Sequence, residues 1–295
     1  MHEALHKLVA AHVLRWPGTG AAAVVSPSGV VASAGPLDLP FAWASVTKLL
    51  VALAALVAVE ERALDLEESA GPPGSTFAHL LAHASGLPFE GHVPVAPPAR
   101  RRIYSNTGIE HAASHLGQRA GMPFGDYLTA GVLEPLGMQG TTLHGSPAHG
   151  ARGPLSDLAR LAAELVSPSL VSRATWQRAV SVAWPGLVGV VPGFGRHDPC
   201  DWGLGPELRG HKWPHWTGRS NSPATYGHFG QSGSFVWVDP AAGIGLCGLC
   251  STAFGPWAKQ AWPVLSDAVL RRGQTETDAG AHPGTSPLSG TGRRR

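Results

Sequence analysis

The segment Ser45-Val46-Thr47-Lys48, followed by the apolar run from Leu49 to Val59, decides how the rest of the chain is interpreted. Residues three apart lie on one face of a helix, so Ser45 and Lys48 are expected within hydrogen-bond reach at the start of a buried helix. A serine hydroxyl is a weak nucleophile that needs an adjacent base. Burial against leucines disfavours the charged form of a lysine and lowers its pKa, which makes Lys48 a candidate for that base.

Length and composition indicate a globular protein. The chain has 295 residues, of which 43% are hydrophobic and 14% charged, enough for one large domain or two intimate ones. A formal net charge of +2 gives no reason to expect nucleic acid as a partner. The three cysteines do not form a disulfide framework, and Cys247 and Cys250 lie in an apolar run that indicates core positions rather than half of a zinc site.

No segment has the pattern of a membrane span or of a secretory signal. The apolar run over residues 49–59 is much shorter than the about 20 residues that cross a bilayer. Residues 1–16 predict an amphipathic helix, without the basic region, long apolar block and cleavage site of a signal peptide. We therefore expect a soluble, cytoplasmic protein; the sequence does not indicate its oligomeric state.

Strand signals occur near both ends of the chain, and helix signals dominate the middle. Residues 21–25 and 30–34 predict a hairpin around the turn Ser26-Pro27-Ser28-Gly29. Four further strands are predicted over residues 202–205, 226–229, 234–238 and 244–250. Helical periodicity predicts helices over residues 1–16, 45–59, 76–83, 109–120, 124–132, 155–166, 172–180 and 256–271.

This distribution predicts an α+β fold, with one antiparallel sheet built from both chain ends and flanked by the terminal helices in an α/β sandwich-like arrangement. Residues 1–36 and 185–272 would form this sheet lobe, and residues 37–184 an inserted all-helical lobe. Residues 273–295, rich in Gly, Ser, Thr and Pro, predict a disordered tail. A cleft between two such lobes is a common place for an active site.

Two further motifs follow the first in a fixed order, Tyr104-Ser105-Asn106 and Gly227-His228-Phe229-Gly230-Gln231. Together with Ser45-Val46-Thr47-Lys48 they resemble the three motifs of the serine β-lactamase and penicillin-binding-protein superfamily. The class C-related branch, with its β-lactamase-like esterases and D,D-carboxypeptidases, is the most similar. The likeness covers about residues 21–270 and implies a β-lactamase/transpeptidase-like fold.

The resemblance implies a role for each catalytic residue. Ser45 would be the nucleophile that forms an acyl-enzyme, and either Lys48 or Tyr104 would be the base for acylation. Tyr104 would protonate the leaving group and later activate water. Because the pKa of a free tyrosine is about 10, Tyr104 can act as a base only beside positive charge. Asn106 would donate a hydrogen bond to Lys48 or to the substrate.

The third motif implies an oxyanion hole and departs from the family pattern at one position. The backbone N–H groups of Ser45 and Gln231 would form the hole, and Gly230 would let the substrate lie close to the strand. The family usually opens this motif with a lysine that meets a substrate carboxylate, whereas this chain has His228, followed by the bulky Phe229. A histidine with a pKa of about 6.5 is a weaker partner for an anion, so a neutral ester or amide is the expected substrate.

The sequence therefore predicts a serine hydrolase, a β-lactamase-like esterase, that acts through an acyl-enzyme on a small-molecule ester or amide. One alternative is a D,D-carboxypeptidase or weak β-lactamase, and another is a catalytically silent homologue that binds a ligand in the same cleft. Residues 89–102 and 195–222, with Trp202, Trp213 and Trp216, are predicted to line the pocket. Nothing in the sequence implies a cofactor or a metal ion.

Overall fold

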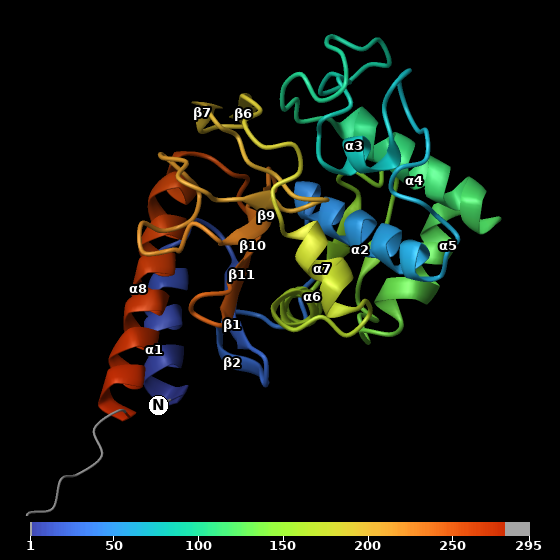
Figure 1. The fold of residues 1–295 in the computed structure, drawn as a ribbon. Helices are drawn as coiled ribbons and strands as arrows, with labels where there is room; N and C mark the ends of the chain where they lie inside the picture. Colours follow the sequence, from blue (N-terminus) through green and yellow to red (C-terminus); the bar gives the residue numbers. More distant parts are fainter. Residues whose placement is uncertain (1, 281–295) are drawn as a thin grey trace, which may run out of the picture.

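A six-stranded antiparallel sheet forms the centre of the fold in the computed structural model, which describes residues 2–280 (Figure 1). Its strand order is β2-β1-β11-β10-β9-β8. The first and last strands of the chain are neighbours, with Gly20 opposite Cys250 and Val25 opposite Gly245. Both chain ends therefore build one antiparallel sheet, as predicted. The strands are β1 (Gly20–Ser26), β2 (Gly29–Ala34), β8 (Glu207–Leu208), β9 (Tyr226–Gly230), β10 (Ser234–Asp239) and β11 (Ile244–Cys250).

Alternate residues of the central strands belong to two different cores, because successive side chains of a strand point to opposite faces. Ala22 and Val24 join the core beneath the terminal helices α1 (His2–Val13) and α8 (Pro256–Gly280). Ala23 and Val25 join the larger core on the other face. Figure 1 shows α1 and α8 side by side along one face of the sheet. With both faces covered, the strands are apolar on both sides.

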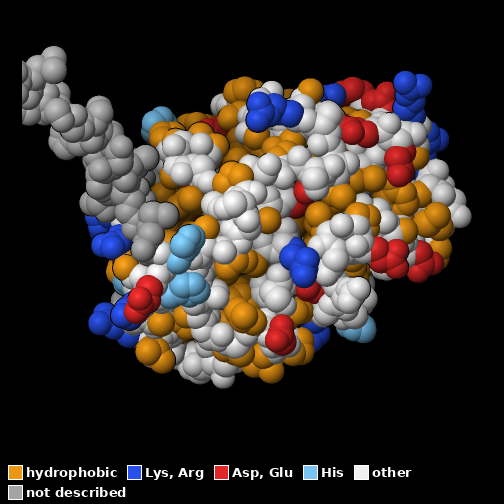
Figure 2. Space-filling view, turned by 90° about the horizontal axis from the view of Figure 1, so that it is seen from below, with side chains coloured by type: hydrophobic (Ala, Val, Ile, Leu, Met, Phe, Trp, Pro, Cys, Tyr) orange, Lys and Arg blue, Asp and Glu red, His pale blue; other side chains and the backbone are white. Residues whose placement is uncertain are grey.

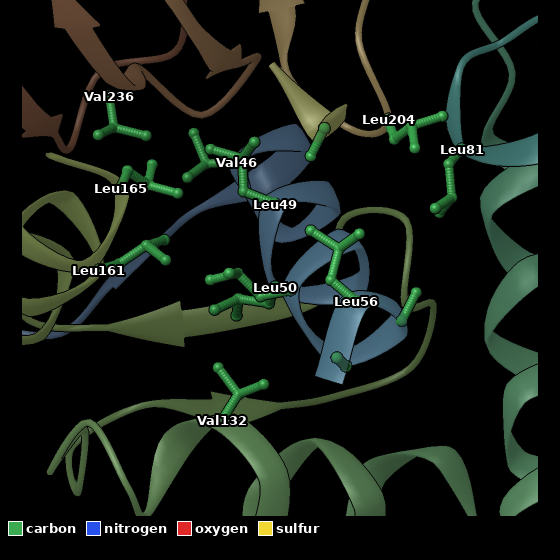
Figure 3. Packing of buried hydrophobic residues seen from close by; sticks show 14 of the residues in the cluster. Val46, Leu49, Leu50, Leu56, Leu81, Val132, Leu161, Leu165, Leu204 and Val236 are labelled. Carbon is green, nitrogen blue, oxygen red and sulfur yellow. The ribbon is translucent and has the colours of Figure 1, made fainter. Parts of the chain in front are cut away.

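The helix α2 (Thr47–Glu60) runs through the larger core directly after a short 3₁₀ turn, η1 (Ala44–Val46). Every residue from Thr47 to Ala58 is buried, and Lys48 is the one charged residue among them. A helix that is apolar on all sides is a core helix. Figure 3 shows the leucines of α2 among side chains from neighbouring elements, including Val132, Leu161, Leu165 and Val236.

The other predicted helices are also present, with one notable boundary. The helix α4 begins at Asn106 rather than at Ile109, because Ser105 caps it by accepting a hydrogen bond of 2.9 Å from the Gly108 N–H. The remaining helical elements are α3 (Phe77–Leu81), α4 (Asn106–Ala120), α5 (Phe124–Leu128), the π-helical η2 (Thr129–Leu133), α6 (Leu155–Val166) and α7 (Arg173–Ala179). Short strands β3 (Phe41–Ala42), β4 (Thr142–Leu143) and β5 (Ala151–Gly153) form a second sheet, and β6 (Gly189–Val191) and β7 (Gly195–His197) form a hairpin.

Three predictions need comment. No strand forms over residues 202–205, where Trp202 makes only an isolated bridge to Glu207. The helix α8 continues to Gly280, so the predicted tail is helical at its start; residues 274–278 contain no glycine or proline. The rest of the predicted tail, residues 281–295, lies outside the described residues. The segment 37–184 is not all-helical as predicted, because β3, β4 and β5 pair into a small sheet within it. The division into two lobes stays a prediction, and α6, from this segment, packs on β1 and β11.

The outer surface of the described residues is mixed in character. On the face in Figure 2, acidic and basic side chains both occur among hydrophobic and uncharged ones. Within residues 2–280, no helix combines the length and the apolar character that crossing a membrane requires.

Candidate active site

The backbone just before Ser45 is held in an unusual conformation. Ala44 has a φ of +43°, in the left-handed region that side chains with a Cβ rarely adopt, at a cost of about 1–3 kcal/mol. The Thr47 hydroxyl donates to the Ala44 carbonyl at 2.6 Å and accepts the Ala151 N–H at 3.0 Å. These bonds tie the turn both to α2 and to β5. Ser45 itself is half-buried at the start of the helix.

A second set of contacts fixes this turn against the end of β9. The Ser232 hydroxyl donates to the Ala42 carbonyl at 2.7 Å, and the Ser234 hydroxyl donates to the Trp43 carbonyl at 2.6 Å. Gly230 lies against the same segment, and a Cβ at this position would come within 2.4 Å of the Trp43 carbonyl oxygen. Only glycine therefore lets the third motif approach the turn that carries Ser45.

The Lys48 amine has three neighbours. Its Nζ lies 3.3 Å from Ser45 Oγ, 2.7 Å from Asn106 Oδ1 and 2.8 Å from the Ala148 carbonyl oxygen. The side chain has no solvent exposure. Burial lowers the pKa of Lys48 to about 7, and the charge of Glu110 offsets only part of this effect.

These contacts revise one prediction and add a residue that sequence reasoning missed. Asn106 accepts a hydrogen bond from Lys48, whereas the sequence predicted that it would donate one; the amide turns its oxygen toward the amine because an N–H needs an acceptor. Ala148 contributes only its backbone carbonyl, so its side chain gives no signal in the sequence. The loop holding that carbonyl is anchored where the Ser146 hydroxyl donates to Glu110 at 2.5 Å.

Tyr104 lies beside Lys48, with Nζ 4.8 Å from the centre of its ring. Aromatic neighbours surround it: the ring centres of His83, Trp202 and Phe89 are 4.6, 5.8 and 6.0 Å away. Burial raises the pKa of Tyr104 above its ordinary value, and a hydrogen bond with Ser45 offsets only part of that rise. Tyr104 is therefore a neutral phenol at pH 7 rather than a phenolate.

His228 lies next to Tyr104 in the candidate site. Its Nδ1 lies 2.7 Å from the Phe229 carbonyl oxygen, which can only accept, so Nδ1 carries the proton. Its Nε2 therefore presents a lone pair, 3.5 Å from the Tyr104 hydroxyl. Burial, together with the charge of Lys48, lowers the pKa of His228 to about 4. His228 is thus an uncharged hydrogen-bond acceptor at pH 7.

The remaining predicted site residue, Gln231, follows the end of β9 and is exposed. Its carbonyl accepts the Phe254 N–H at 2.9 Å, while within the described residues its own N–H donates no hydrogen bond. A free backbone N–H next to Gly230 has the chemistry of an oxyanion-hole donor.

A pocket of about 860 Å³ opens beside Tyr104. Residues 89–102 contribute to it as predicted, but within the segment 195–222 only Arg196 lines it. Trp213 is 46% exposed elsewhere, and Trp216 is buried and donates to Glu207 at 2.7 Å. The sequence did not predict the wall formed by residues 188–192, which include β6.

Comparisons with known proteins agree with this architecture. The Beta-lactamase family matches residues 15–270. The crystal structure of a beta-lactamase from Mycobacterium bovis shares 50% sequence identity, covers 90% of this chain and 99% of its own, and superposes with a TM-score of 0.88. No curated protein sequence matches significantly.

More distant structures share the fold alone. EstCE1, described as a hydrolase with promiscuous acyltransferase activity, is 17% identical, with 91% of this chain and 99% of that chain covered and a TM-score of 0.77. An octameric penicillin-binding protein homologue from Pyrococcus abyssi is 19% identical, with 94% and 77% covered and a TM-score of 0.68.

Proposed function

Because the chain belongs to the beta-lactamase family, we propose that it is a serine hydrolase that cleaves small-molecule esters or amides through an acyl-enzyme on Ser45. The observation that carries this proposal is the geometry around Lys48. A neutral amine has two N–H donors and one lone pair. Asn106 and the Ala148 carbonyl take the two donors, so the lone pair is left for the Ser45 hydroxyl.

This geometry supports Lys48, rather than Tyr104, as the base for acylation. With a pKa of about 7, about half of the Lys48 side chains are neutral at pH 7. The amine takes the proton of Ser45 while Oγ forms a bond to the substrate carbonyl carbon. The N–H groups of Ser45 and Gln231 would stabilise the oxyanion that develops.

Tyr104 would serve as the acid. Its neutral hydroxyl donates a proton to the leaving-group oxygen or nitrogen as the bond to the acyl carbon breaks, and the Lys48 ammonium returns a proton to the phenolate. Before substrate binds, the Tyr104 hydroxyl proton points toward His228 Nε2, 3.5 Å away, and the leaving atom would replace His228 as its acceptor. Deacylation then uses water: Lys48 takes the proton of the attacking water and returns it to Ser45 Oγ as the acyl group leaves.

An esterase is the activity that the site supports best. The neutral His228 supplies no fixed charge for a carboxylate next to the scissile bond. A second candidate, a β-lactamase, is favoured by the 50% identity to the Mycobacterium bovis protein that carries this description. A D,D-carboxypeptidase and a silent ligand-binding homologue remain the other two candidates.

A substrate panel combined with active-site labelling distinguishes these candidates. We expect a fluorophosphonate probe to label Ser45, located by peptide mass spectrometry, and short-chain nitrophenyl esters to be cleaved faster than a chromogenic cephalosporin or a D-alanyl-D-alanine peptide. Faster cleavage of the cephalosporin would identify a β-lactamase. No labelling together with no turnover would leave the silent homologue.

The pH dependence should follow Lys48. Since the base must be neutral, kcat/KM for a nitrophenyl ester is expected to rise with pH, with a midpoint near the lysine pKa of about 7. The rate should fall about tenfold for each pH unit well below that midpoint. Stopped-flow assays from pH 5 to 9 measure the profile, with the uncatalysed hydrolysis subtracted. A rate that declines as pH rises from 6 to 8 would contradict this assignment of the base.

Removing the Tyr104 hydroxyl is expected to slow acylation selectively. The Tyr104→Phe variant keeps the ring packed among Trp202 and Phe89, and general acid catalysis contributes about 10²–10⁴-fold. The loss should be large for an alkyl ester and small for a nitrophenyl ester, whose leaving group needs no proton. Comparing kcat/KM for the two esters tests the role, and equal losses would argue for a purely structural effect.

A further inference from the structure

The pocket beside Tyr104 has an apolar body. Three of its wall residues are half exposed: Phe89 at 50%, Val95 at 53% and Val190 at 54%. Its apolar lining consists mainly of Phe89, Val95, Ile103, Val188, Val190 and Pro192. Exposed apolar side chains around a concavity of this size are typical of a small-molecule site.

The charge around the pocket is of one sign. Among the described residues that line it, the charged side chains are Arg101, Arg102 and Arg196, and no acidic residue is among them. Arg102 is buried, and its guanidinium donates to the carbonyls of Ala82, Ala183 and Cys200. These bonds occupy its N–H groups, so it is not a partner for a ligand. Arg101 and Arg196 are exposed and remain available to a ligand.

The two available arginines approach the pocket from different elements. Arg101 belongs to the loop before Tyr104 and donates one hydrogen bond, of 3.2 Å, to the Val95 carbonyl, which leaves most of its N–H groups unused. Arg196 lies on β7 directly opposite Val190 on β6, so the two side chains share one face of the hairpin. Both are pocket-lining residues, and guanidinium groups recognise carboxylates in bidentate geometry.

We propose that this pocket binds the leaving group of the substrate, and that this group is an apolar chain ending in a carboxylate held by Arg196 and Arg101. The inference rests on the proposed function and extends it to a substrate class: esters or amides whose alcohol or amine part carries a remote anion. The carboxylate would bind at Arg101 and Arg196, away from His228. An uncharged His228 is therefore compatible with a negatively charged substrate.

The position of Tyr104 assigns the pocket to the leaving group rather than to the acyl group. Tyr104 lines the pocket, and its hydroxyl is the proposed proton donor to the leaving atom. A group bonded to that atom must therefore start within hydrogen-bond reach of the tyrosine. Its chain then extends along the apolar wall, which excludes water from it, toward the arginines.

Matched esters test this assignment. The butanoyl ester of 6-hydroxyhexanoate carries the anion, and the butanoyl ester of 6-hydroxyhexanamide is its neutral counterpart of the same length. We expect wild-type kcat/KM to favour the anionic ester by about tenfold at low salt, with the preference reduced at 0.5 M salt. Both Arg196→Ala and the double variant with Arg101→Ala should lose that preference, so that kcat/KM falls about tenfold more for the anionic ester than for the neutral one. Arg160→Ala, an exposed α6 variant outside the pocket, is the matched control.

The outcomes separate this inference from the proposed function. Cleavage of both esters at equal rates would overturn the anion site and leave the hydrolase standing. A preference that survives in the double variant, or that appears only when the carboxylate is on the acyl chain, would also overturn the assignment. If neither ester is cleaved and the fluorophosphonate does not react, the proposed function fails and the inference fails with it.

Discussion

Replacing Ser45 by alanine is expected to lower ester hydrolysis by at least about 10³-fold and to abolish fluorophosphonate labelling. In serine hydrolases, loss of the nucleophile removes the acyl-enzyme route and leaves only the rate that binding and the oxyanion hole supply. Ser45 is half-buried, and its hydroxyl makes few contacts apart from Lys48 and Tyr104, so the variant should fold normally. Unchanged circular dichroism and melting temperature verify this.

A matched control is Ser181→Ala. Ser181 is exposed at the end of α7, where its hydroxyl donates only to the Gln177 carbonyl at 2.6 Å. This variant should retain full labelling and turnover. Wild-type activity in the Ser45 variant would place the nucleophile elsewhere and remove the basis of the mechanism.

Replacing Lys48 by methionine should remove most of the activity and should change how stability depends on pH. Activity is expected to fall by about 10³-fold or more, since Ser45 loses the base that activates it. Holding this lysine with a pKa of about 7 costs about 5 kcal/mol relative to the unfolded chain at pH 6, and methionine removes that cost. Asn106 and the Ala148 carbonyl lose their donor at about 1–3 kcal/mol each, so the two effects nearly cancel at pH 6.

The sign of the pH dependence makes this test specific. Between the folded pKa of about 7 and the unfolded pKa of about 10.4, the unfolded chain binds more protons at Lys48, so wild-type stability from this group grows as pH rises. The methionine variant lacks that slope. The methionine variant should therefore be most stable relative to wild type at pH 6 and lose stability relative to wild type toward pH 9, as measured by urea titration. A difference independent of pH would mean that Lys48 is charged in the folded protein.

The features that local spacing determines were predicted well. The i, i+3 relation of Ser45 and Lys48 and the apolar run behind them define α2, and the hairpin and turn signals near both ends define the antiparallel sheet. The resemblance in three motifs anticipated the family. These signals succeed because helix and strand periodicity is a property of neighbouring residues.

Features that depend on contacts across the chain were not predicted. The Ala148 carbonyl reaches Lys48 from 100 residues away and carries no side-chain signal. The protonation states of Tyr104 and His228 follow from burial, which packing sets rather than residue type. The arginine at 196 joins the pocket only because the β6–β7 hairpin folds over the loop before Tyr104.

The pairing of β1 with β11 has a consequence for biosynthesis. Ser45 and Lys48 are translated well before β9 and the amide of Gln231. Ser45 and Gln231 cannot come together until β9, β10 and β11 have left the ribosome and paired with β1. A chain truncated before residue 226 would thus carry the proposed nucleophile without the proposed oxyanion-hole donor at Gln231, and it is expected not to react with the fluorophosphonate.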